Sequence, residues 1–323
     1  MKRLKEILRA GGKVIAFGVG LYGVLMTVFL LLRPLLGEQF ILIAFFNQYL
    51  PALFFPSFIF LLSTLVLRRM RLMVLQLPAL LGFMLLYRDV MLPPPADIQP
   101  GETRFTLLTY NIMAQNLDYA HVEAVMRAAD SDVIVVQEII PEAAEYLQPA
   151  LLDVYPYTAL HTDIEQGVFS RYPLSEDSSW RNLHGLYQRV QVELEDAQVI
   201  VYNVHPLPSF WWSRGILDPT RHQAEIIDLL GRAADESGPL LLAGDFNMSD
   251  QSDDYFRVRA NYGDAFRAEG GGLGLTISST FLTTRVDYVF YNPEIVPVEA
   301  HVGTDTGGSD HYPVWVELSL IGN

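Results

Sequence analysis

Hydrophobic and polar positions divide the chain into two parts with different patterns. Residues 1–92 hold three long apolar runs, whereas the chain after residue 103 has short apolar runs separated by polar turns. Long uncharged runs are typical of membrane-spanning helices, and short runs bounded by turn residues are typical of strands. We therefore expect an N-terminal membrane region over 1–92, a Pro-rich linker over 93–102 and a folded domain over 103–323.

The three apolar runs predict three transmembrane helices, at about 14–32, 49–67 and 72–88. The first run has 19 residues without a charge, which is long enough to cross a hydrocarbon core of about 30 Å. A cleavable signal peptide is the alternative, but no small-residue cleavage site follows the run. The third run has only 16 residues, so a helix lying on the membrane surface is the alternative there.

Basic residues are unevenly distributed around these runs. Five precede the first run and three lie between the second and third, whereas only Arg33 lies in the first connection. By the positive-inside tendency, the N-terminus faces the cytoplasm, and three crossings place the folded domain outside the plasma or inner membrane. Asn47 and Gln48 interrupt the second run as a polar pair, which helix–helix packing explains.

Charge separates the two parts as sharply as hydropathy does. Residues 1–92 carry ten basic and three acidic residues, a net charge of +7, whereas the remainder has 12 Arg, no Lys and 34 acidic residues, a net charge of −22. Nucleic-acid binding depends on clustered Lys and Arg, so such a domain is a poor general binder of nucleic acid. The chain has no cysteine, which excludes a disulfide framework and a thiolate metal site.

Periodicity after residue 103 predicts an α/β domain with mixed or antiparallel sheets, because strands outnumber helices and many neighbouring strands are close enough for hairpins. Helices are predicted at 119–129, 141–152 and 219–234, and Asp218 is the expected N-cap of the last one. Strands are predicted at 104–110, 132–137, 155–160, 166–171, 187–195, 198–204, 240–243, 285–291 and 313–318.

Acid, amide and imidazole side chains follow several of these predicted strands. They are Asn111, Glu138, His205, Asp245, Asn247, Asp287 and the adjacent pair Asp310 and His311. A single Asp or Asn at a strand end is usually a turn former, so the argument depends on the joint pattern. Carboxylate and amide oxygens suit Mg²⁺ or Mn²⁺, and imidazoles can act as general acids or phosphate ligands. The pattern therefore indicates one hard-cation site built from strand ends.

The same segments, taken in order, resemble those of the endonuclease/exonuclease/phosphatase superfamily. They are Leu-Thr-Tyr-Asn111, Val-Val-Gln-Glu138, Asn-Val-His205, Gly-Asp245-Phe-Asn247, Arg-Val-Asp287-Tyr and Gly-Ser-Asp310-His311. This superfamily includes deoxyribonuclease-like nucleases and neutral sphingomyelinases, and the resemblance covers about residues 103–320. It implies a four-layer α/β sandwich of two packed mixed sheets, here preceded by the three-helix transmembrane region. It also implies Mg²⁺-dependent cleavage of a phosphoester, with Mn²⁺ as a substitute metal.

The resemblance also implies roles for the oxygen-bearing residues. Glu138 is expected to be the principal metal ligand, with Asn111 and Asp310 nearby. Asp245 is expected to position or deprotonate the attacking water, and Asn247 to hold a phosphate oxygen.

The two histidines have implied roles as well. His311 is expected to contact and polarise the phosphate, with Asp287 holding its ring, and His205 is expected to protonate the leaving group. Because the domain is strongly acidic, the metal and these imidazoles must supply most of the positive field at the site. Arg171 and Arg285 are candidate helpers, although no pattern fixes their direction.

The superfamily leaves the substrate open, because one fold supports many functions. The loop Pro206 to Trp212 ends in three aromatic residues, Phe210, Trp211 and Trp212, which suit a lipid interface; packing under the next helix is the alternative. The membrane tether and the acidic domain favour a phospholipid or sphingolipid headgroup as substrate and the bilayer as partner. An extracytoplasmic deoxyribonuclease-like nuclease and an inactive membrane-associated binding module are the alternatives, and the oligomeric state is left open.

Overall fold

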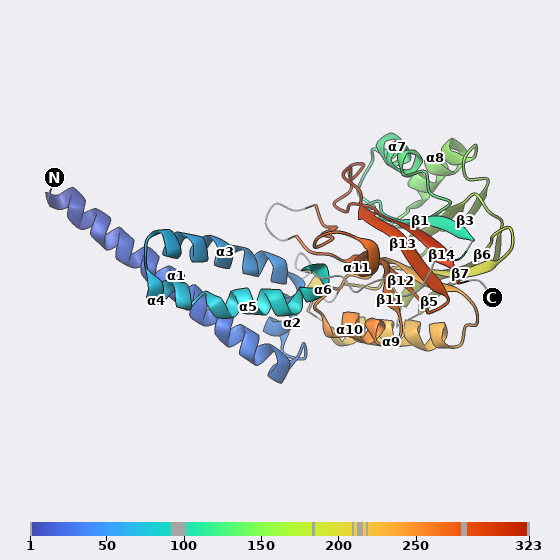
Figure 1. The fold of residues 1–323 in the computed structure, drawn as a ribbon. Coiled ribbons are helices and arrows are strands. Elements are labelled where there is room, and N and C mark those ends of the chain that lie inside the picture. Colours follow the sequence, from blue (N-terminus) through green and yellow to red (C-terminus); the bar gives the residue numbers. More distant parts are fainter. Residues whose placement is uncertain are drawn as a thin grey trace.

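A computed structural model describes residues 2–91, 101, 103–182, 185–208, 210–211, 216–217, 219–278 and 283–321. An elongated helical region at the N-terminus adjoins an α/β domain that contains the rest of the chain (Figure 1). The predicted linker at 93–102 lies almost entirely outside the described residues, as do the predicted N-cap Asp218 and the side chains of the aromatic loop.

Six helices are described in the N-terminal region. In chain order they are α1 (Lys2–Leu36), α2 (Ile41–Gln48), α3 (Leu50–Val66), α4 (Met70–Val74), α5 (Leu77–Leu86) and α6 (Arg88–Met91). Helices α1, α3 and α5 lie side by side, with the N-terminus and α4 at the far end and α2 and α6 next to the α/β domain (Figure 1). The last turn of α1 is therefore close to the domain, whereas its first turn points away from it.

The predicted number of transmembrane helices, three, is larger than the number that the structure supports. Among the described residues, only Arg9–Leu36 is by itself long and apolar enough to cross a membrane. A second span arises only if α2 and α3, which meet at an angle of 71°, are counted together. The third predicted span is divided into α4 with five residues and α5 with ten. Even counted together as the apolar segment Met70–Leu86, these helices reach only about 25 Å at about 1.5 Å per residue, less than a hydrocarbon core of about 30 Å.

Two six-stranded sheets form the α/β domain. The first has the order β13-β14-β1-β2-β4-β3 and the second has the order β11-β12-β10-β7-β6-β5. The strands of the first sheet are β1 (Arg104–Asn111), β2 (Val133–Gln137), β3 (Tyr157–His161), β4 (Gln166–Ser170), β13 (Ile295–Val302) and β14 (Val314–Leu320). Those of the second are β5 (Leu174–Asn182), β6 (Gly185–Glu193), β7 (Gln198–Val204), β10 (Leu240–Asp245), β11 (Gly263–Asp264) and β12 (Asp287–Tyr291), and a separate pair joins β8 (Phe210–Trp211) to β9 (Ile216–Leu217).

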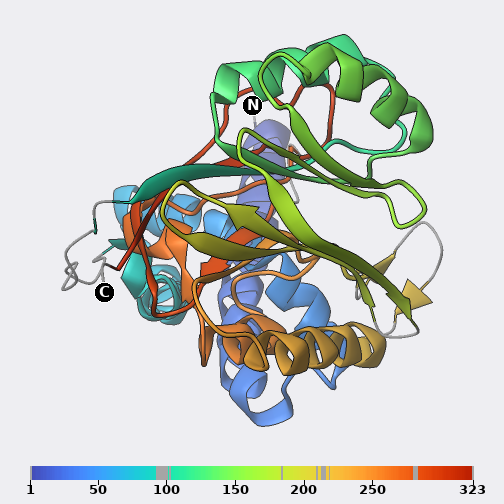
Figure 2. The same cartoon turned by 90° about the vertical axis from the view of Figure 1, so that its right-hand side faces the viewer.

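The two sheets pack face to face and helices cover their outer faces, which confirms the predicted four-layer α/β sandwich of mixed sheets (Figure 2). Apolar side chains from both sheets, among them Leu107, Val135, Val201 and Leu241, fill the central core. Helices α7 (Tyr119–Ala129) and α8 (Pro141–Leu151) cover the first sheet, and α9 (Pro219–Ala234) and α10 (Asp253–Arg259) cover the second. A short helix, α11 (Ala265–Glu269), follows β11.

Strand pairing brings the predicted site segments to one rim of the sandwich. Strands β1 and β2 are parallel, as are β7 and β10, so their carboxyl ends meet at the same edge of each sheet. Antiparallel β12 begins at that edge, with Asp287 opposite Asp245. Gly244 permits the close approach of β10 to β7, because a Cβ atom there would lie 2.0 Å from the Val204 carbonyl oxygen.

The helical region is fastened to the α/β domain by polar contacts. Asn47 donates to the Glu38 carboxylate and accepts from Arg33, at 2.8 Å each, and its carbonyl accepts from the Ser249 hydroxyl at 2.9 Å. The other Glu38 oxygen accepts from the Asp253 backbone N–H at 2.9 Å, at the first turn of α10. Helix–helix packing alone therefore does not explain the polar pair at 47–48, because Asn47 organises the junction with the domain.

Candidate active site

Asn111 and Glu138 form the side of the site that the first sheet contributes. Asn111 is buried, and its Nδ2 atom donates to Glu138 Oε1 and to Asp245 Oδ2, at 3.1 Å each. Glu138 has a φ of 60°, a strained conformation for a non-glycine residue and one that is frequent at functional sites. Burial raises the pKa of Glu138, but His205, the Ala114 N–H group and Asn111 outweigh burial and lower it. Glu138 is therefore ionised at neutral pH.

Asp245 lies between the two histidines. Its Oδ2 atom is 3.7 Å from His205 Nε2 and 3.7 Å from His311 Nε2, and its Oδ1 atom accepts from the Asn247 backbone N–H at 2.8 Å. Burial raises the pKa of Asp245 above its ordinary value, despite the opposite effect of His311 and His205. Asn247 has a φ of 51° and donates to the Pro206 carbonyl at 3.0 Å, which fixes its side chain beside the loop after His205.

His311 is held by Asp287. Its Nδ1 atom is 2.9 Å from Asp287 Oδ2, so Nε2 faces Asp245 at 3.7 Å and Asp310 at 4.0 Å. Burial lowers the pKa of His311, but the negative charges of Asp287, Asp245 and Asp310 outweigh burial and raise it to about 10. The His311 ring is therefore cationic at neutral pH, as a group that polarises a phosphate requires.

Replacing Asp287 with Asn tests this arrangement. The carboxylate raises the pKa of His311, so we expect Asp287→Asn to lower that pKa and to shift the alkaline limb of the pH–kcat/KM profile to lower pH. Asp305→Asn is the matched control, since Asp305 pairs with the exposed His121 at 2.9 Å. An alkaline limb that is the same in Asp287→Asn and the unsubstituted protein would contradict the assignment.

All eight predicted site residues lie in or beside this cluster, although Asp310 stands at its edge with a side chain that is 61% exposed. The two candidate arginines point elsewhere: Arg171 binds Asp130, and Arg285 is buried against Asp264. Sequence reasoning gave no role to Ser309, whose hydroxyl donates to the Asn111 carbonyl at 2.7 Å and accepts from the His311 N–H at 3.0 Å. The position of Ser309 directly before Asp310 and His311 could have marked it as part of the site.

The donor set fits a divalent cation. Asp245, Asp287 and His311 place ligand atoms within 4.8 Å of one another in the described part of the chain. The second Asp287 oxygen is buried there without a hydrogen-bond partner. Glu138 and Asp245 add hard oxygens on either side of the Asn111 amide. The unpartnered Asp287 oxygen is therefore an open donor, and the oxygens of Glu138 and Asp245, which accept hydrogen bonds from Asn111, are further candidate ligands.

The sequence profile of the Endonuclease/Exonuclease/phosphatase family matches residues 108–311, from the middle of β1 to His311. The chain belongs to this family. The family's members are hydrolases that act on phosphoesters and typically use a divalent metal, which agrees with the donor set at the rim.

Solved structures share the fold of the α/β domain. A family member from Beutenbergia cavernae is 22% identical with a TM-score of 0.55, over 68% of this chain and 72% of its own. TDP2 from D. rerio, humanised by 14 mutations, is 14% identical with a TM-score of 0.57, over 67% of this chain and 99% of its own. The mannosyl-6-phosphatase Bt3783 from Bacteroides thetaiotaomicron is 17% identical with a TM-score of 0.55, over 67% of this chain and 100% of its own.

One curated relative matches by sequence. The UPF0294 protein of Vibrio vulnificus (strain YJ016) is 28% identical over 163 residues, which is 48% of this chain. The chain spans about half the length of this relative, 45%.

Proposed function

We propose that this protein is a membrane-anchored, Mg²⁺-dependent phosphoesterase that hydrolyses a phosphodiester or phosphomonoester in a phospholipid or sphingolipid headgroup. The observation that carries the proposal is the attachment of the site to an apolar helical region. Ser249 and Asp253, which bind that region, lie four and eight residues after Asp245 on the same segment.

The side chains at the rim supply the steps of phosphoester hydrolysis. Asp245 orients the attacking water and accepts its proton, while cationic His311 donates from Nε2 to a phosphate oxygen. Asn247 offers a second donor to that phosphate, and His205 protonates the leaving oxygen. A Mg²⁺ ion held by Glu138 and its neighbours would supply positive charge that stabilises the transition state.

Exposed apolar side chains on the helical region support membrane anchoring. Val14 and Phe17 on α1 are each 71% exposed, and Leu62 on α3 is 63% exposed. A surface this apolar marks a protein or membrane interface. A single crossing by α1 gives the orientation predicted above, with the N-terminus cytoplasmic and the domain outside the cytoplasm.

A lipid substrate suits the surroundings of the helical region better than nucleic acid does. A cavity of about 520 Å³ between α1 and α5 is lined mainly by apolar side chains, and Arg33 and Asp253 lie at its domain end. Such a groove suits an acyl chain. Nucleic acid, in contrast, meets a domain over 103–323 with a net charge of −20 and no Lys.

The test is a hydrolysis panel with Mg²⁺ and the full chain in detergent. We expect release of free or phosphorylated headgroup from phospholipid or sphingomyelin liposomes, and little digestion of plasmid or single-stranded DNA at low salt. Asp245→Ala and His311→Ala serve as blanks. Paired Trp211→Ala and Trp212→Ala substitutions should weaken lipid hydrolysis more than cleavage of a soluble chromogenic ester. Activity on DNA with none on any lipid would instead establish the nuclease alternative.

A further inference from the structure

The corner between α2 and α3 reaches the active site. A cavity of about 150 Å³ opens beside Asn247 and is lined on the domain side also by Pro208, Ile277 and Thr284. Its opposite wall is Gln48 and Tyr49, the last residue of α2 and the residue that joins it to α3. A group attached to a phosphate at Asn247 would therefore meet side chains from the helical region.

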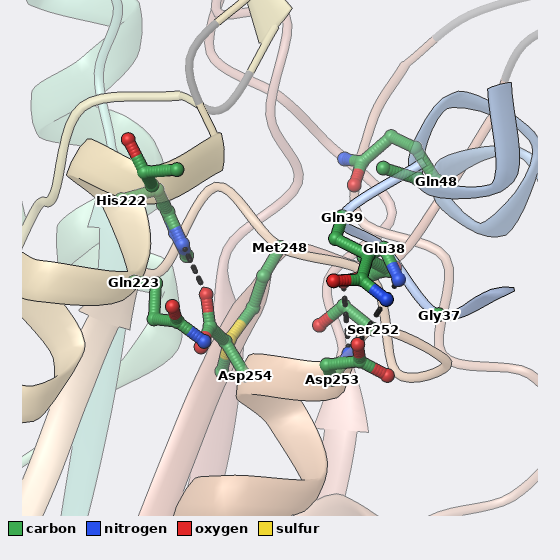
Figure 3. A pocket seen from close by; sticks show the side chains of 12 residues that line it. Gly37, Glu38, Gln39, Gln48, His222, Gln223, Met248, Ser252, Asp253 and Asp254 are labelled. Carbon is green, nitrogen blue, oxygen red and sulfur yellow. Dashed lines mark hydrogen bonds and ion pairs between the residues drawn. The ribbon is translucent and has the colours of Figure 1, made fainter. Parts of the chain in front are cut away.

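A second cavity, of about 290 Å³, is also lined by Gln48. Figure 3 shows Glu38, Gln39 and Gln48 of the helical region on one side and His222 of α9 on the other. The Gln48 amide makes no hydrogen bond within the described part of the chain, and it is shared by both cavities. Together the cavities reach the size of small-molecule sites, about 300–1,000 Å³.

The lining of these cavities has an acidic and amide character. Glu38, Asp253 and Asp254 line the larger cavity together with His222, whose ring is 2.9 Å from Asp254 and offsets part of that negative charge, and no Lys or Arg lines either cavity among the described residues. Carboxylates in a partly buried space repel a bound anionic group, so such a group is disfavoured in the larger cavity. Amide and carboxylate groups bind hydroxyl and ammonium groups by hydrogen bonding.

We infer that the cavities around Gln48 are the subsite for the second ester group of the substrate, and that this group is polar and carries no negative charge. The inference rests on the proposed phosphoesterase activity and assigns the helical region a part in substrate binding as well as anchoring. Gln48 bonds the polar group through its amide, and the Tyr49 ring packs against it.

The shared fold supports this assignment. The matches to TDP2 and to the mannosyl-6-phosphatase cover 99% and 100% of those chains but only 67% of this one in each case, about the length of its α/β domain. The wall formed by Gln48 and Tyr49 thus belongs to a part of the chain that lies outside the shared fold. Ser249, two residues after Asn247, donates a hydrogen bond to the carbonyl of Asn47, the residue before Gln48. This bond holds the wall next to the segment that carries Asn247.

Soluble chromogenic diesters test the subsite without a membrane. Each carries p-nitrophenol as the leaving group and choline, glycerol or glycolate as the second ester group. We expect kcat/KM to be about tenfold lower for the anionic glycolate ester than for the other two. Gln48→Ala and Tyr49→Ala should each raise KM about tenfold for the choline and glycerol esters, with little change in kcat and none for bis(p-nitrophenyl) phosphate.

Two further variants and a binding measurement make the test decisive. Gln48→Lys should reverse the preference, favouring the glycolate ester, and Phe40→Ala, at an exposed aromatic on the same region, should change nothing. Calorimetry with glycerophosphocholine and the Asp245→Asn protein measures binding without turnover, and there Gln48→Ala should raise Kd about tenfold. An unchanged Kd would overturn the subsite even in an active enzyme. Absence of hydrolysis with an intact, Gln48-dependent Kd would overturn the phosphoesterase instead.

Discussion

Replacing Asp245 with Asn is expected to lower kcat by about a thousandfold, within the roughly 10²–10⁴ that general base catalysis contributes. The substitution keeps the size of the side chain but removes the charge that faces both His205 and His311 at 3.7 Å. It also removes the group that takes a proton from the attacking water. The measurement is steady-state hydrolysis of bis(p-nitrophenyl) phosphate with Mg²⁺ by full-length protein.

A matched control separates catalysis from folding. Asp132 is also a carboxylate that accepts local hydrogen bonds, from the N–H and hydroxyl of Thr106 at 2.8 and 2.9 Å. It precedes β2, at the end of the strand opposite the site, so Asp132→Asn should leave kcat within about twofold. If Asp245→Asn kept more than a tenth of the original rate, the assignment of Asp245 as the base would be wrong.

The site was largely predictable from the sequence because its residues occupy strand ends. Parallel pairing of β1 with β2 and of β7 with β10 brings such ends to one rim. Asn111, Glu138 and Asp245 therefore lie close together irrespective of the conformation of the loops. The roles assigned to individual residues stay predictions. The directions of Arg171 and Arg285 could not be predicted, because their partners Asp130 and Asp264 are set by tertiary packing.

Elements without clear periodicity were missed. Strand β5 has the sequence Leu-Ser-Glu-Asp-Ser-Ser-Trp-Arg-Asn, in which only Leu174 and Trp180 are apolar and no alternation appears. Helix α10 was not predicted, although Ser252 caps it and Asp253 and Asp254 occupy its first turn, a recognisable helix start. The third membrane span was overpredicted because hydropathy alone ignores the break between α4 and α5.

The contacts between the helical region and the α/β domain could not be predicted for a different reason. Arg33, Glu38 and Asn47 bind residues more than 200 positions later in the chain, and no local pattern encodes such a contact. The polar pair at 47–48 is recognisable in the sequence because it interrupts an apolar run. Helix packing explains such a pair as long as the contact between Asn47 and the α/β domain is not known.

Replacing Asp264 with Ala is expected to destabilise the domain by about 3–5 kcal/mol, the usual cost of leaving one partner of a buried ion pair alone. Arg285 and Asp264 bind each other with side chains that are almost fully buried, and the Arg285 guanidinium lies 4.5 Å from the centre of the Tyr288 ring. Asp264 also accepts from the Tyr255 hydroxyl at 2.8 Å and caps α11 through the Arg267 N–H. Urea unfolding of the full chain followed by tryptophan fluorescence gives the free energy.

A double substitution distinguishes the buried charge from simple loss of packing. If the unpaired guanidinium causes most of the loss, Asp264→Ala combined with Arg285→Met should recover more than half of it, because an apolar side chain of similar volume tolerates burial. If the double variant were as unstable as the single one, the hydrogen bonds to Tyr255 and α11 would be the dominant contribution. The result bears on catalysis, because Arg285 lies two residues before Asp287, which holds His311. The ion pair thus stabilises the start of the strand on which the orientation of the His311 ring depends.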